Sequence, residues 1–138
     1  MDEFIIPSAA GCGGLLFYDR APSDLVEPIG SFRVRVMDHN LSAVGQVYAG
    51  YAPAHPVPLF TEMARHWSGW SGELSWESLE GELALRCNHD RLGHISIRVE
   101  LRSGPMEVDW RVTAVIMAEA GQLEDIALRA AQFFGQPR

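Results

Sequence analysis

Hydrophobic and polar residues alternate along the middle of the chain, between residues 82 and 116. The hydrophobic positions of the clearest segment, 94–102, are Ile95, Ile97, Val99 and Leu101. A strict period of two is typical of a strand with one buried face. Residues 82–87 and 108–116 alternate in the same way, so this region predicts a meander of three antiparallel strands.

The register of this meander follows from matching its inward residues. Centring the first hairpin on Arg91 pairs Cys87 with Ile95. Pairing Leu101 with Val108 in the second hairpin leaves a short loop that contains Ser-Gly-Pro-Met. A slip of one residue would turn every inward side chain outward, so the pattern restricts the choice of register.

The remaining segments divide into short strands and two helices. Further strands are predicted over residues 4–6, 15–18, 31–37 and 43–51. Pro58 suits the first turn of a helix that Gly69 stops. The hydrophobic stripe of that helix is Leu59, Phe60, Met63, Ala64 and Trp67. A second helix is predicted from its own stripe, Leu123, Ile126, Ala127, Ala130 and Phe134, with Gly135 at its end.

These elements predict one α+β domain over residues 1–138. We expect a mainly antiparallel meander sheet of six or seven strands. One inserted helix and one C-terminal helix should pack on one face of it. A chain of 138 residues that is 47% hydrophobic can bury a core of its own.

The charge of the chain narrows the classes of partner. Eighteen acidic residues outnumber eleven basic residues, which gives a net charge of -7. This negative charge argues against nucleic acid or an anionic membrane as the binding partner, and it suits docking onto a basic protein. All eleven basic residues are arginine, which excludes a Schiff-base lysine and a P-loop lysine.

The N-terminus and the cysteines indicate a reducing compartment. The opening residues are acidic and lack the long hydrophobic stretch of a signal peptide. No hydrophobic run reaches the length of a membrane span. Cys12 and Cys87 form no metal-binding spacing. We therefore expect a cytoplasmic protein without a cofactor.

The segment from Asn88 to His94 carries the densest chemistry. His89, Asp90 and His94 are of metal-ligand type and flank one turn. Zinc normally takes three or four protein ligands, and no Cys or His-x-x-x-His pair lies nearby. Turn formation by Asp90, with Gly93 at positive φ, explains the same residues more simply. We assign no catalytic or metal-binding residue, and keep the three as candidate binding residues.

A tryptophan-rich segment follows the inserted helix. Trp67 falls on the hydrophobic stripe of that helix and is expected in the core. Trp70 and Trp76 lie between glycines and are candidate binding residues, since exposed tryptophan is favoured at binding hot spots. The carboxylates after it predict a solvated acidic edge, not an acid–base pair. These residues are Glu73, Glu77, Glu80 and Glu82.

The second half of the chain resembles a family of small bacterial proteins of unknown function. The resemblance covers residues 67–134 and rests on four short motifs. They are Trp67-x-Gly-Trp70, Ser78-Leu-Glu-Gly81, His89-Asp-x-x-Gly-His94 and Glu119-Ala-Gly-Gln-Leu-Glu124. It implies the fold and a bacterial source, with no assigned activity. More loosely, the size, acidity and layout are similar to immunity proteins of toxin systems.

Three functions fit these observations. The first is a non-enzymatic binding protein, an immunity-type acidic partner of a basic protein. The second is a small metal-dependent or small-molecule enzyme that uses His89, Asp90 and His94. The third is a structural domain that forms a homodimer through an open sheet edge.

Overall fold

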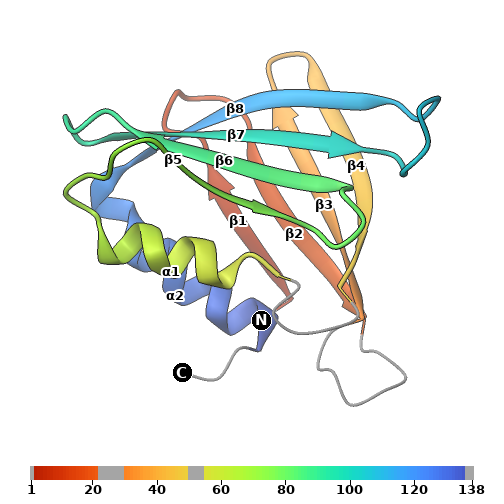
Figure 1. The fold of residues 1–138 in the computed structure, drawn as a ribbon, viewed down its shortest axis with the longest axis horizontal. Coiled ribbons are helices and arrows are strands. Elements are labelled where there is room, and N and C mark those ends of the chain that lie inside the picture. The colour runs from red at the N-terminus through yellow and green to blue at the C-terminus, as the bar shows by residue number, and fades with distance from the viewer. Residues whose placement is uncertain (1, 22–29, 50–54, 136–138) are drawn as a thin grey trace.

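The computed structural model describes residues 2–21, 30–49 and 55–135 and contains two antiparallel sheets of four strands. The first sheet holds β1 (Glu3–Pro7), β2 (Gly14–Ala21), β3 (Ser31–Asp38) and β4 (Leu41–Tyr48). The second holds β5 (Glu73–Glu77), β6 (Leu83–His89), β7 (His94–Arg102) and β8 (Arg111–Glu119). In each sheet the strands follow one another in chain order, so both are meanders. The strands of the two sheets cross each other in Figure 1.

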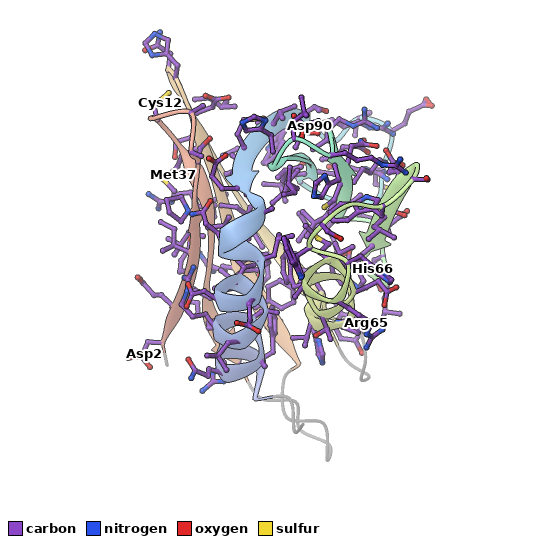
Figure 2. The ribbon with its side chains drawn as sticks, turned by 90° about the vertical axis from the view of Figure 1, so that its left-hand side faces the viewer. Asp2, Cys12, Met37, Arg65, His66 and Asp90 are labelled. Atoms are coloured by element: carbon purple, nitrogen blue, oxygen red, sulfur yellow. The ribbon has the colours of Figure 1, made fainter. Side chains whose placement is uncertain are left out.

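Two helices lie side by side between the sheets at one end (Figures 1 and 2). Helix α1 (Val57–Arg65) connects the sheets, and α2 (Leu123–Phe134) follows β8 after a short 3-10 turn, η1 (Ala120–Gln122). Helix α2 contacts β1, while α1 contacts β5 and packs along α2. The helices thus complete a core that the two sheets alone leave open.

The predicted α+β class is confirmed, with one inserted and one C-terminal helix. Within the described residues the strands number eight, against the six or seven expected. The additional strand is β5, because its alternation spans only five residues next to glycines and resembles a connector in sequence. Residues 50 and 51, predicted as the end of the strand from residue 43, lie outside the described residues.

The core is a single cluster that both sheets and both helices share. The six phenylalanines of the chain are all buried in it. They are Phe4, Phe17, Phe32, Phe60, Phe133 and Phe134. Their rings gather where the first sheet meets the helices, whereas β6, β7 and β8 contribute aliphatic side chains. The inward alternation predicted from the sequence supplies the second half of this core.

The predicted registers of the second sheet are wrong, although the inward faces of β6, β7 and β8 are right. Cys87 pairs with Ile97, two residues beyond the predicted partner, which preserves the face of every side chain. In the second hairpin, Leu101 pairs with Val112 instead of Val108. The connection therefore lengthens to eight residues, 103–110, because hydrogen bonds within the loop replace the expected strand pairing.

No helix among the described segments is both long and apolar enough to cross a membrane.

Candidate functional site

The turn between β6 and β7 is organised by the carboxylate of Asp90. Its Oδ1 accepts hydrogen bonds from the backbone N–H groups of Leu92 (2.7 Å) and His94 (3.0 Å). Its Oδ2 lies 2.7 Å from Nδ1 of His94. Gly93 has a φ of +95°, which confirms the conformation predicted for it. Figure 2 shows Asp90 at the end of the molecule, above the helices.

His89 ties this turn to the segment that follows α1. It pairs with Ile95 in the inward register and is half-buried, not on the solvent side of the turn. Its Nδ1 accepts the N–H of Arg91 at 2.7 Å, and its Nε2 lies 2.8 Å from the carbonyl oxygen of Trp67. Because a carbonyl only accepts, Nε2 carries the ring proton. Both ring nitrogens are therefore already bonded within the protein.

Asp90 and His94 shift each other's proton affinity. The pKa of Asp90 is lowered to about 2, chiefly because its carboxylate accepts the N–H of Leu92, with His94 contributing further. The pKa of His94 is raised above its usual value, first by the hydrogen bond to Asp90 and then by the charge of that carboxylate. Glu119 adds to the same shift. The two side chains thus form an exposed ion pair in mildly acidic solution.

We expect the titration midpoint of His94, followed by NMR, to fall when Asp90 is replaced by asparagine. A histidine whose folded pKa is raised stabilises the fold below its unfolded pKa of about 6.5. That contribution is lost as the pH rises through the folded pKa. An unchanged midpoint in Asp90→Asn would show that the pair does not form in solution.

The hollow beside this turn is small and open. Its volume is about 150 Å³, and its lining comprises Asn88, His89, Asp90, His94, Ser96 and Met117. In the part of the chain that the structure describes, no three His, Cys, Asp or Glu residues are grouped to hold a metal ion. Cys87 lies below the same turn, and burial raises the pKa of its thiol to about 12, helped by the charge of Glu73. A thiol with such a pKa is not a ready nucleophile.

The expected positions of the tryptophans are partly reversed. Trp70 is only 8% exposed, and its Nε1 donates a hydrogen bond to the Cys87 carbonyl at 3.3 Å. Trp67, expected in the core, is 60% exposed because α1 ends at Arg65, before the helical stripe reaches it. Trp76 is half-buried against the core from β5. Of the predicted binding residues, Trp70 and His89 contact each other, with ring centroids 5.0 Å apart.

A second exposed feature is the β7–β8 loop, residues 103–110, at the opposite end of the same sheet (Figure 1). Val108 is 91% exposed, Met106 is 64% exposed and Trp110 is 43% exposed. The alternation over residues 108–116 predicts Val108 and Trp110 on the inward face of a strand. Their alternation continues that of β8, so hydrophobic pattern alone could not separate loop from strand.

Hydrogen bonds within the loop hold these side chains outward. Asp109 Oδ2 accepts the N–H of Met106 at 2.7 Å, and the Asp109 N–H donates to the Met106 carbonyl at 3.1 Å. Ser103 bonds Trp110 twice, through its N–H and through its Oγ, each at 3.1 Å. Arg102 closes the base by donating to the Pro105 carbonyl at 2.9 Å. The signal available in sequence was Asp109, a residue type that organises turns.

The β5–β6 turn, residues 78–82, lies at the same end of the sheet. The backbone N–H of Arg102 donates to the carbonyl of Glu82 at 2.8 Å and links the turn to the loop. We call the exposed residues of the two connections the loop-end surface. Its apolar members are Leu79, Met106, Val108 and Trp110. Its exposed carboxylates are Glu80 and Glu107, and the exposed Glu77 adjoins them at the end of β5.

Comparison with known proteins identifies the family. The model of a family of unknown function, DUF6228, matches residues 6–137. The chain belongs to this family. The match includes both sheets almost completely, and it agrees with the resemblance to a family without assigned activity. No curated protein and no solved structure matches the chain.

Proposed function

We propose that this DUF6228 protein is a non-enzymatic binding protein whose partner is a more basic protein. The observation that carries the proposal is the loop-end surface, where hydrophobic side chains are held outward on an internally bonded loop. Hydrophobic residues that remain exposed as a group are a common mark of protein interaction sites. The proposal includes an immunity-type role, in which this protein would cover the active surface of its partner.

The rigidity of the β7–β8 loop supports this role. Binding is costly when a loop must be ordered at the moment of contact. Here Asp109 and Ser103 already bond the loop backbone, so Val108 and Trp110 are presented without further ordering. Tryptophan is also among the residues that contribute most to protein interfaces. Trp110 is therefore the expected hot spot of the contact.

Charge supports a basic partner. Exposed Glu80 and Glu107 lie in the two connections that carry the hydrophobic residues, Glu77 lies at the end of β5, and the whole chain carries a net charge of -7. Opposite charge at the rim of an interface steers the two proteins together and raises the association rate. The proposal places this encounter in the cytoplasm, since Cys12 and Cys87 are both free thiols.

The test uses the purified full-length protein as bait in an extract of its source cell. We expect a basic partner to be recovered at about 0.05 M salt and to be released as salt approaches about 0.5 M. With that partner purified, Trp110→Ala should raise the dissociation constant about thirtyfold. This corresponds to a hot-spot loss of about 2 kcal/mol.

Leu92→Ser supplies a matched control. Leu92 is an 80% exposed hydrophobic residue in the β6–β7 turn, at the other end of the same sheet. The Leu92→Ser variant should bind the partner with the same dissociation constant as the unchanged protein. Recovery of no basic partner, or equal loss of binding in Leu92→Ser and Trp110→Ala, would refute the proposal.

A further inference from the structure

Among the residues that the structure describes, strand β4 has an open edge along most of its length. The N–H of Tyr48 points away from β3, since it donates to Glu82 Oε2 at 3.0 Å. Backbone N–H and C=O groups of alternate residues in a strand point the same way. Those of Ser42, Val44 and Gln46 therefore also point outward, and they bond to no other described residue. Such a row of groups is a template for another strand.

The other outer strands carry features that oppose pairing. On β1, Arg129 Nη1 donates to the Ile5 carbonyl at 2.7 Å, and Pro7 has no N–H to offer. Strand β5 has five residues, and its ends are Glu73 and Glu77. On β8, the segment after β1 bonds the backbone of Met117. The Met117 N–H donates to Ser8 Oγ at 3.2 Å, and the Met117 carbonyl accepts the Ala9 N–H at 2.7 Å.

Among the described residues, strand β4 has a single contact of this kind, that of Tyr48 with Glu82, and it lies at the end of the strand. Its eight residues, Leu-Ser-Ala-Val-Gly-Gln-Val-Tyr, include no charged residue and no proline. Natural sheets normally protect a long open edge with charge, proline or a covering segment. The contrast among the four outer strands indicates that the β4 edge is left open for pairing.

We infer that β4 pairs with β4 of a second copy of this chain, antiparallel, about a twofold axis at Val44. This register sets Val44 opposite Val44 and Ser42 opposite Gln46. Each of these pairs has its backbone groups pointing outward, so each can exchange two N–H···O bonds. The side chains are neutral, so two copies of an acidic protein meet here without like charges facing each other.

The inward side of the same register is also compatible. Ala43 of one copy falls opposite Gly45 of the other, and both positions are small. Gly45 lies directly under Leu101 of β7, where an added Cβ would come within 2.8 Å of Cδ1. Pairing would extend the first sheet into one of eight strands, and Ala43 and Gly45 bring no large side chain to its inward side. The hydrogen-bonded pairs between the two copies do not include Tyr48, whose N–H is already bonded to Glu82.

Val44→Pro tests the inference while leaving the monomer intact. Its N–H points outward, so proline removes a bond of the dimer but none to β3. We expect sedimentation equilibrium between about 10 μM and 1 mM to show a dimer for the unchanged protein. The variant should raise the dissociation constant at least about tenfold. Should Val44→Pro lose its folded circular dichroism spectrum, Val44→Lys serves instead, because it places two ammonium groups opposite each other.

Val115→Pro is the matched control. Val115 is an exposed valine on an outer strand, and its N–H points outward by the same alternation from Met117. This variant should dimerise normally. A Val44→Cys protein that also carries Cys12→Ser should form a disulfide-linked dimer, since such a pair brings the two Cα atoms to about 5.5 Å. A monomer at every concentration, an unaffected dimer in Val44→Pro or Val44→Lys, or no cross-link would each overturn the inference.

Discussion

Phe17→Ala is expected to lower the free energy of unfolding by about 3–5 kcal/mol. Phe17 is fully buried at the centre of the phenylalanine cluster. Its ring lies 5.3 Å from that of Phe4, 5.8 Å from Phe134 and 5.9 Å from Phe32, measured between centroids. Removing the ring takes away buried hydrophobic surface and leaves a cavity between strands and helices that pack rigidly.

Urea unfolding followed by tryptophan fluorescence measures this loss as a lower midpoint at unchanged slope. Tyr18→Ala is the control, since the neighbouring side chain points to the other face of β2 and is only half-buried. Its cost should be about 1 kcal/mol, the range of strand preference alone. Equal costs for the two variants would mean that the phenylalanine cluster does not hold the sheets and helices together.

Gly13→Ala is expected to cost roughly 3 kcal/mol, which is large for one added methyl group. Gly13 has a φ of +85°, where a residue with a Cβ is strained. A Cβ at this position would also lie 2.2 Å from the backbone carbonyl oxygen of Met37 on β3. That oxygen belongs to a paired strand, so it cannot move aside without breaking the sheet. Thermal unfolding should show a melting temperature lower by about 10 °C.

Gly93→Ala separates the two causes. Gly93 has a φ of +95°, but a Cβ there would meet nothing within 4 Å. Its expected cost is only the backbone strain, about 1–2 kcal/mol. The difference between the variants therefore measures the clash with β3. If Gly93→Ala is as damaging as Gly13→Ala, strain alone accounts for both, and the close approach of Met37 has no energetic role.

The candidate site shows how far residue types can be interpreted without their surroundings. His89, Asp90 and His94 were predicted to flank one turn, and they do. The hydrogen bonds of Asp90 and His94 join residues at most four positions apart, so sequence spacing predicts them well. The bond of His89 to the Trp67 carbonyl joins residues 22 positions apart, and no spacing rule contains it.

The loop-end surface was missed for a related reason. Val108 and Trp110 continue the alternation of β8, so their pattern predicts buried strand positions. Hydrogen bonds between Ser103 and Trp110, and between Met106 and Asp109, instead close the loop before the strand begins. Whether a residue of this segment is buried depends on whether it pairs with β7, and pairing with β7 begins only at Arg111, after the loop. The exposed side chains therefore became visible only in three dimensions.

By itself the sequence determined the α+β class, the two helices and the inward face of the strands around Ile97, because hydrophobic period is a local property. It also determined the positive φ of Gly93, since a tight turn between two strands favours glycine at such a position. The tertiary structure decided the division into two sheets, the strand registers and the exposure of Trp67 and Trp110. A shift of two residues keeps every side chain on its face. Hydrophobic pattern cannot distinguish such registers, and contacts between distant segments choose among them.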